Sequence, residues 1–178
     1  WLGGNGFAAK IIHELVGPDT AAYDPANVVV FALGPANGSP FWGSNRGLVA
    51  AISPATDGFF DSVFGGDFAW ALKQAGWDAI AITGAAERPV YVRVDADSVS
   101  VEDATELWGL GVEDTIGEIR SRVGAKSECA VIGPGGEHQV EYGAVVCSGR
   151  RISAAGRGGI GSVLGSKRCK AVAVSGTV

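Results

Sequence analysis

Two Gly-Gly pairs are the features of this sequence best suited to binding an anion. They are Gly65-Gly66 and Gly158-Gly159, and each precedes a segment with the residue spacing of a short helix. The first turn of a helix presents free N–H groups and the positive end of the helix dipole. Two such junctions that face one centre would hold a ligand with two anionic arms.

Two arginines, Arg46 and Arg157, are candidates for binding the same kind of ligand. Arg46 lies between the turn-forming run Gly43-Ser-Asn and a predicted strand, and Arg157 has only small neighbours, so an anion can come close to Arg157. A guanidinium group holds a phosphate through two parallel N–H bonds. The alternative for each residue is an ordinary surface arginine, and the pattern leaves both interpretations open.

The charge distribution agrees with an anion site near the C-terminal end. The chain has 178 residues and a net charge of −5, which disfavours nucleic acid as a partner. Residues 142–178 nevertheless carry six basic and no acidic side chains, a local charge of +6. The other residues have eight basic and nineteen acidic side chains, so a small positive region lies on an acidic body.

Other familiar motifs are excluded by their surroundings. Residues 156–161 satisfy GxGxxG, but about nine residues separate them from the preceding predicted strand and no acidic residue follows, so we do not expect a Rossmann site. Lys167 is followed by Arg168 rather than Ser or Thr, which excludes a P-loop. No Cys or His spacing suits zinc or an iron–sulfur cluster, and no catalytic set of side chains is identifiable. Three cysteines are expected to be buried free thiols: Cys129, Cys147 and Cys169.

The hydrophobic pattern predicts an α+β domain. The chain is 47% hydrophobic and 19% charged, as folded domains are, and no apolar run reaches the ~18 residues of a membrane span. Helices are predicted at residues 4–16, 67–74, 113–123 and 159–165. Strands are predicted at residues 28–33, 47–52, 59–64, 78–83, 89–94, 98–101, 129–132, 140–146 and 170–175.

An internal sequence repeat, which we call the echo, suggests that the domain has two halves. Residues 65–84 run Gly-Gly, short helix, turn, apolar strand, glycine, and residues 158–176 repeat this order with one residue fewer. Upstream, the apolar run that ends at Gly34-Pro35 is matched by one that ends at Gly133-Pro134. We therefore expect two similar β-α-β-rich halves, about residues 1–86 and 87–178, related by a pseudo-twofold axis, with mixed sheets and no Rossmann fold. Coincidence between generic glycine-helix-strand units is the alternative.

Five segments, in order along the chain, resemble the N-terminal domain of the aldehyde ferredoxin oxidoreductases. They are residues 69–80, 88–91, 103–109, 132–137 and 155–161, and the resemblance covers essentially the whole chain. It implies that residues 1–178 are the metallopterin-binding domain of a longer oxidoreductase, which agrees with a chain that starts at Trp1 and contains no Met. The implied cofactor is a tungstopterin or molybdopterin, in which two pterins hold one metal and magnesium bridges their phosphates.

The resemblance also implies the residues that bind this cofactor. Arg46 matches a pterin-phosphate arginine, and Gly65 matches a glycine that lets the backbone meet the cofactor. Val63 and Ala154 match the residues whose backbone carbonyls bind magnesium. The predicted site is completed by Gly66, Ser153 and Arg157.

Two of these positions depart from the family pattern. Asn is common in the family where Val63 stands, and a backbone carbonyl survives that change. Arg is common where Ser153 stands, and Arg151 could compensate from two positions earlier. No residue of this chain is expected to be catalytic.

The activity implied by the resemblance is the oxidation of aldehydes to carboxylic acids, with electrons passed to an iron–sulfur cluster and ferredoxin. The 4Fe-4S cluster would lie in later domains of the same polypeptide. The implied partners are those domains, ferredoxin or another electron-carrier subunit and a second copy of the chain, without nucleic acid or a membrane, in the cytoplasm. The alternatives are a class II benzoyl-coenzyme A reductase-like enzyme, a non-catalytic domain that has lost the cofactor, and nucleotide binding through residues 156–161.

Overall fold

The computed structural model describes residues 2–175, and their strands form two β-sheets. The four-stranded sheet has the order β3-β2-β1-β4 and is antiparallel throughout. Its strands are β1 (Val29–Ala32), β2 (Gly47–Ile52), β3 (Phe59–Phe64) and β4 (Ala79–Ile82). β1 is buried over its whole length, as its uninterrupted apolar run predicts.

The six-stranded sheet has the order β6-β5-β10-β7-β8-β9. Its strands are β5 (Val90–Val94), β6 (Val99–Asp103), β7 (Glu128–Val131), β8 (Val145–Cys147), β9 (Ser153–Ala155) and β10 (Cys169–Val174). β5 and β6 form the predicted hairpin, and β5 runs parallel to β10. The prediction of mixed sheets is therefore confirmed for this sheet and wrong for the four-stranded sheet.

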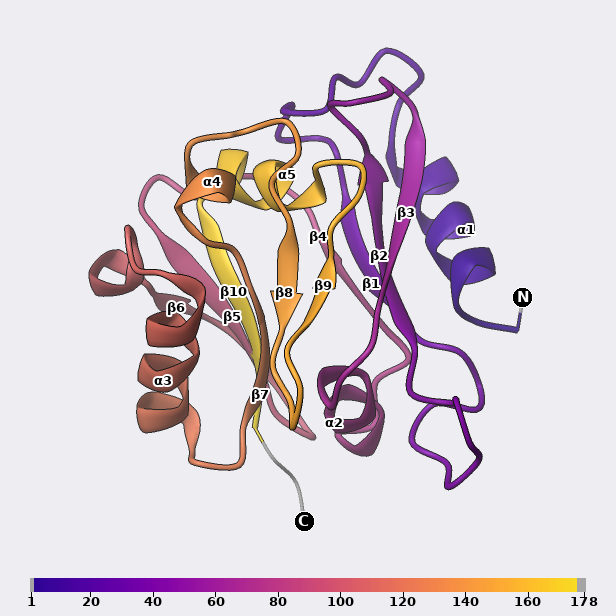
Figure 1. The fold of residues 1–178 in the computed structure, drawn as a ribbon. Helices are drawn as coiled ribbons and strands as arrows, with labels where there is room; N and C mark the ends of the chain where they lie inside the picture. Colours follow the sequence, from indigo (N-terminus) through magenta and orange to yellow (C-terminus); the bar gives the residue numbers. More distant parts are fainter. Residues whose placement is uncertain (1, 176–178) are drawn as a thin grey trace.

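Helices cover the outer faces of both sheets and fill the space between them (Figure 1). α1 (Asn5–Leu15) packs outside the four-stranded sheet, and α3 (Val112–Val123) packs outside the six-stranded sheet. α2 (Phe68–Gln74) and α5 (Ile160–Ser166) join residues of both sheets in the central core. Within residues 2–175, no helix has the length and hydropathy needed to cross a membrane.

Both sheets contain the same antiparallel arrangement of four strands. In one sheet β1 pairs with β2 and β4, and β2 pairs with β3. In the other, β7 pairs with β8 and β10, and β8 pairs with β9. A short helix precedes the last strand of each set, α2 before β4 and α5 before β10. The echo in the sequence therefore corresponds to a repeated topology, to which the second sheet adds the β5–β6 hairpin.

The strand predicted at residues 140–146 is confirmed only at its end, where β8 spans Val145–Cys147, and it is wrong for residues 140–144. Residues 140–143 form a turn instead, in which the Gly143 N–H donates to the Val140 carbonyl at 2.7 Å. A Cβ atom on Gly143 would lie 3.1 Å from the Ser162 nitrogen, so the backbone passes very close to α5. Within this turn only Gly143 is buried and Tyr142 is 80% exposed, so the apolar residues of the segment do not mark one face of a sheet.

Three short elements were not predicted: β9, the 3₁₀ helix η1 (Thr105–Leu107) and α4 (Pro134–Glu137). β9 ends at Ala155, directly before the GxGxxG segment at residues 156–161. The predicted gap of nine residues between a strand and that segment is therefore wrong. β9 is nevertheless an antiparallel outer strand, whereas a Rossmann site needs a parallel βαβ unit.

The glycines of α4 and α5 let the two helices touch backbone to backbone. A Cβ atom on Gly165 would lie 2.7 Å from the carbonyl carbon of Gly136, and one on Gly136 would lie 2.9 Å from the Gly161 oxygen. Only residues without a Cβ atom fit such an approach. Much of the glycine in this region therefore serves packing.

A fully buried ion pair joins β10 to α4. The Lys170 ammonium binds the Glu137 carboxylate, and their side chains are 0% and 2% exposed. Glu137 also accepts the Gly109 N–H at 2.9 Å, and Lys170 donates to the Leu110 carbonyl at 2.9 Å. The pair therefore ties segments 103–109 and 132–137 together, so these two segments stabilise the fold through one cluster.

Candidate functional site

The outer strands β3 and β9, one from each sheet, lie next to each other, and we call the line between them the seam. The Gly65 N–H donates to Ser153 Oγ at 2.8 Å, and the Arg157 N–H donates to Ser62 Oγ at 3.2 Å. Gly65 lies beyond the end of β3 and Ser153 at the start of β9, whereas Arg157 lies beyond β9. The two strands therefore run antiparallel across the seam, with one of these hydrogen bonds near each end.

Val63 and Ala154 occupy the same position in the two sheets. Each belongs to a row of residues that pair across neighbouring strands. One row contains the residue two positions before Gly34-Pro35, and the other contains the residue two positions before Gly133-Pro134. Across the four strands the rows read Val63, Leu48, Ala32, Ala79 in one sheet and Ala154, Val146, Val131, Ala171 in the other. The register alone thus makes the two residues equivalent.

The Val63 carbonyl points away from its own sheet. The Ser53 N–H donates to the Gly58 carbonyl at 2.9 Å, directly beyond the Ile52–Phe59 pair. Antiparallel pairs alternate between those that exchange hydrogen bonds and those that do not. Counted from this bond, the Leu48–Val63 pair does not exchange hydrogen bonds. The N–H and C=O of Val63 therefore face away from β2, toward the seam.

The same argument applies to the Ala154 carbonyl. The Ser148 N–H donates to the Cys129 carbonyl at 2.8 Å, so by alternation Val146 exchanges its hydrogen bonds with β7. The backbone groups of Val146 therefore do not face β9, and its partner Ala154 directs its own N–H and C=O away from β8. Two equivalent carbonyl groups thus face the seam from opposite sides. Backbone carbonyl oxygens are ligands that suit Mg²⁺.

The remaining predicted residues lie around this seam. Arg46 immediately precedes the Gly47–Phe64 pair, so the register places it beside Gly65, and its side chain is exposed on the wall of a cavity of about 410 Å³. The Arg157 side chain is also exposed, while its backbone is held at the seam by Ser62. Among residues 2–175, neither guanidinium group forms a salt bridge. Both are therefore available to an external anion.

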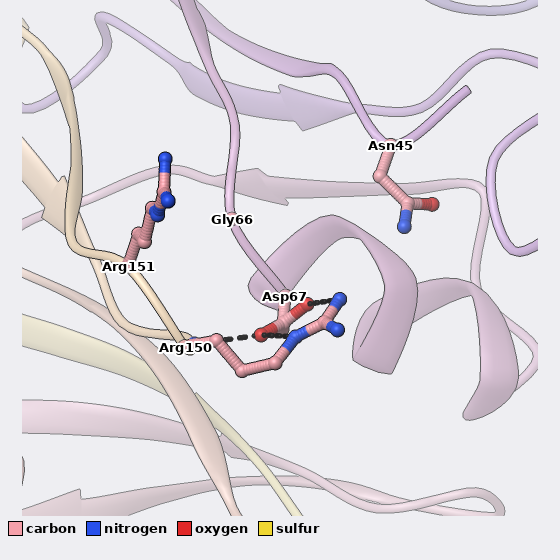
Figure 2. A pocket seen from close by; sticks show the side chains of 5 residues that line it. All are labelled: Asn45, Gly66, Asp67, Arg150 and Arg151. Carbon is pink, nitrogen blue, oxygen red and sulfur yellow. Dashed lines mark hydrogen bonds and ion pairs between the residues drawn. The ribbon is translucent and has the colours of Figure 1, made fainter. Parts of the chain in front are cut away.

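A second cavity, of about 430 Å³, opens beside Gly66. Figure 2 shows that Arg150 folds back onto Asp67, whereas Arg151 extends in another direction and Asn45 approaches from a separate loop. The Asp67 carboxylate accepts the Arg150 N–H at 2.7 Å and its guanidinium group at 3.2 Å. Asp67 thus neutralises Arg150 and leaves Arg151 as the exposed positive charge of this cavity.

Partial burial would raise the pKa of Asp67, but the hydrogen bonds and positive charge of Arg150 outweigh burial and lower the pKa below 3.8. A carboxyl group with a lowered pKa stabilises the folded state above its ordinary pKa and loses that effect as the pH falls through the lowered value. We therefore expect the Arg150 amide to exchange faster with solvent, after correction for the intrinsic rate, as the pH falls through this lowered pKa. Asp67→Asn should show this fast exchange already at pH 7, and Asp57→Asn, at an exposed turn, should not. Equal protection in both variants would contradict the role of Asp67.

The helix N-termini do not form the predicted pair of anion sites. At α5, Gly159 and Ile160 are buried, and the Gly161 N–H donates to the Gly143 carbonyl at 2.9 Å. At α2, the Asp67 carboxylate stands at the start of the helix. The expectation of two free helix ends that face one ligand is therefore wrong, because chain packing occupies one end and an acidic group the other.

The part of the chain that the structure describes contains no group of three or more His, Cys, Asp or Glu side chains placed to hold a metal ion. Its cysteines are free and buried, as predicted. Burial raises the pKa of Cys129 to about 11 and that of Cys169 to about 12. These thiols stay protonated and are unsuited to bind a metal.

Sequence reasoning missed Ser62 and Asp67 as residues of this region. Both could have been noticed from the echo, because Ser62 and Ser153 each precede one of the predicted magnesium-binding residues and Asp67 follows the first Gly-Gly pair. Their hydrogen-bond partners could not have been predicted from the sequence, because each hydrogen bond joins residues more than 80 positions apart.

Comparison with known proteins gives a consistent result. The family model described as aldehyde ferredoxin oxidoreductase, N-terminal domain, matches residues 1–176. A tungsten-containing aldehyde ferredoxin oxidoreductase of Pyrococcus horikoshii is 40% identical over 177 residues, which are 99% of this chain and 29% of that protein. The WOR-like subunit of an aliphatic sulfonate oxidoreductase of Pyrococcus furiosus is 33% identical over 193 aligned residues, 99% of this chain and 30% of that protein.

A solved structure has the same fold. The active site complex BamBC of benzoyl coenzyme A reductase, in complex with 1,5 dienoyl-CoA, contains a chain that superposes with a TM-score of 0.93 at 38% identity. The match covers 99% of this chain and 27% of that one. The chain thus spans less than a third of the length of these relatives. By sequence and by fold, the chain belongs to the aldehyde ferredoxin oxidoreductase family and corresponds to the N-terminal domain of its members.

Proposed function

We propose that this chain binds a bis-pterin tungsten or molybdenum cofactor along the seam, as one part of an oxidoreductase. The observation that carries the proposal is the pair of equivalent backbone carbonyls, at Val63 and Ala154, that face the seam from its two sides. A magnesium ion bound by both oxygens would link the two halves of the domain to the two phosphate groups of such a cofactor. The absence of Asn at position 63 does not weaken this site, since the ligand is the backbone.

The positive charges of the region suit the phosphates of the cofactor. Arg46 and Arg157 are exposed and form no salt bridge among residues 2–175, so both can donate to a phosphate without losing another partner. Arg151 adds a third charge near Gly66, in place of the arginine that the family commonly has at position 153. Gly65 and Gly66 would contact the cofactor through their backbone, and a Cβ atom on either would point at Ser153 or at the Ser148 carbonyl, so glycine at these positions also permits the close approach of the two edges of the seam.

The bound cofactor would supply the redox chemistry, and this domain would hold it in place and balance its charge. The substrate we propose is an aldehyde, oxidised to a carboxylic acid, because the tungsten-containing relatives of this chain are aldehyde ferredoxin oxidoreductases. The electrons would pass to a 4Fe-4S cluster in later domains and then to ferredoxin or another carrier subunit. We place the whole protein in the cytoplasm.

A second candidate is a reductase that acts on an aromatic coenzyme A thioester. The chain in the benzoyl coenzyme A reductase complex is 38% identical to this one, nearly the same value as for the aldehyde enzymes. Domain similarity therefore does not choose between the two substrate classes. Assays of the full-length protein with an aldehyde and with benzoyl coenzyme A, under strictly anaerobic conditions, separate them.

The first test is elemental analysis of the full-length protein, purified without oxygen. We expect about one tungsten or molybdenum, at least one magnesium and about four irons per chain, the last from one cubane cluster. A folded protein that contains none of these metals after expression in a tungstate-supplied host would overturn the proposal. The chain would then be a domain that has kept the fold and lost the cofactor.

Arg46→Ala in the full-length protein is expected to lower the tungsten or molybdenum content severalfold, because a charge-assisted phosphate contact is lost. The fold should persist, since the Arg46 side chain is exposed. Arg88→Ala is the matched control: Arg88 is 76% exposed and lies two residues before β5, outside the seam. Equal metal content in the two variants would rule out the phosphate role of Arg46.

A further inference from the structure

We infer that Ser62 and Ser153 are a pair of positioning residues that hold the two edges of the seam together and thereby set its affinity for magnesium. The inference rests on the proposed function for the identity of the metal. Its structural basis is independent and consists of two hydrogen bonds. Ser153 Oγ accepts the Gly65 N–H at 2.8 Å, and Ser62 Oγ accepts the Arg157 N–H at 3.2 Å.

The two serines are equivalent in the repeated four-strand arrangement. Ser62 pairs with Val49 in one sheet and Ser153 pairs with Cys147 in the other, one row beyond the pairs that contain Val63 and Ala154. Each hydroxyl reaches across the seam to the backbone that follows the opposite strand. The pair is therefore reciprocal: each half of the domain contributes one acceptor and receives one.

These bonds are needed because no ladder joins the two edges. β3 and β9 are the outer strands of separate sheets. The carbonyl groups of Val63 and Ala154 lie between the two serine contacts, near opposite ends of an antiparallel seam. Their relative position thus depends on the serine hydroxyls and on core packing, and the hydroxyls act within three residues of each carbonyl.

Magnesium is sensitive to such positioning. It requires nearly ideal octahedral geometry with oxygen ligands at about 2.0–2.1 Å. Two carbonyls held by rigid neighbours meet this requirement without further ordering, whereas two edges free to shift would lose affinity. The Gly65 amide also has its partner in Ser153, so it stays bound within the protein and serves the geometry of the seam.

The test uses full-length protein carrying Ser62→Ala, Ser153→Ala or both. Exchange of the Gly65 amide should become about tenfold faster in Ser153→Ala, and exchange of the Arg157 amide should do so in Ser62→Ala. The magnesium-to-tungsten ratio after dialysis against metal-free buffer should fall in each variant and fall further in the double variant. Amides in the central strands β1 and β7 report whether the fold as a whole has been destabilised.

Two further variants serve as controls. Ser153→Thr keeps a hydroxyl group and should retain both the protection of the Gly65 amide and the magnesium. Ser121→Ala removes a hydroxyl that bonds to the Glu118 carbonyl on the exposed face of α3, and it should change neither quantity.

The outcomes distinguish this inference from the proposed function. Wild-type protein with tungsten and magnesium, together with alanine variants that lose the local protection but keep the magnesium ratio, would overturn the positioning role and leave the function intact. Unchanged exchange at both amides would likewise overturn it. Wild-type protein without either metal would overturn the proposed function and, with it, the role of the serines in magnesium binding.

Discussion

Lys170→Met is expected to destabilise this domain by about 3–5 kcal/mol, because it leaves the Glu137 carboxylate buried without its countercharge. The side chains of Lys170 and Glu137 are 0% and 2% exposed, so water cannot take the place of the ammonium group. The substitution also leaves the Leu110 carbonyl without its donor. Urea unfolding of the chain, followed by tryptophan fluorescence, measures the loss.

A double substitution separates charge burial from packing. In Lys170→Met with Glu137→Gln, no charge is buried, and the amide oxygen of Gln can still accept the Gly109 N–H that Glu137 accepts at 2.9 Å. We expect this variant to recover most of the stability lost in Lys170→Met. If the free energy of unfolding of Lys170→Met alone lies within about 1 kcal/mol of the wild-type value, the ion pair contributes little to stability. Its burial would then need an explanation other than stability.

The strands were largely predictable from the sequence because burial on both faces gives uninterrupted apolar runs. β1, β2 and β10 lie in the interior of the sheets and are almost completely buried, and their apolar runs were read as strands. β9 has three small residues and one buried position, so no period could reveal it. The turn at residues 140–143 was mistaken for a strand because Val140 and Tyr142 alternate with Glu141 and Gly143, yet Tyr142 is 80% exposed and does not mark a buried face.

The candidate site was only partly accessible to sequence reasoning. The similarity of the two Gly-Gly segments predicted an internal repeat, and the repeat explains why Val63 and Ala154 are equivalent positions in the two sheets. The helix ends were expected to bind the anion, but the structure fills one with backbone and the other with Asp67. Which groups meet across a seam depends on how the two sheets pack, and a pattern along one chain does not contain that information.

The glycine-rich segment illustrates how one motif can have two physical origins. GxGxxG suggests a loop that approaches a phosphate, yet Gly161 and Gly165 are buried against the backbone of other segments. Gly156 alone of this group is exposed, and a Cβ atom there would meet nothing within 4 Å. Gly156→Ala should therefore leave the fold intact. If the nucleotide alternative is correct, the wild-type protein binds a dinucleotide and the Gly156→Ala variant does not.

Gly165→Ala is expected to cost about 3 kcal/mol or more, because its Cβ atom would overlap the backbone of α4. The added atom would lie 2.7 Å from the carbonyl carbon of Gly136 and closer still to its oxygen, and neither is the end of a flexible side chain. α4 would have to move away from α5, which would disturb Glu137 and its bond to Lys170.

Gly117→Ala is the matched control for this substitution. Gly117 is an exposed position in the middle of α3, its Cβ atom would meet nothing within 4 Å, and alanine favours a helix over glycine by about 0.5–1 kcal/mol. Urea unfolding should thus show a gain for Gly117→Ala and a large loss for Gly165→Ala. If Gly165→Ala unfolds like the wild type, the two helices are not in backbone contact, and the glycines of residues 158–165 would then need the ligand-binding explanation that their packing now makes unnecessary.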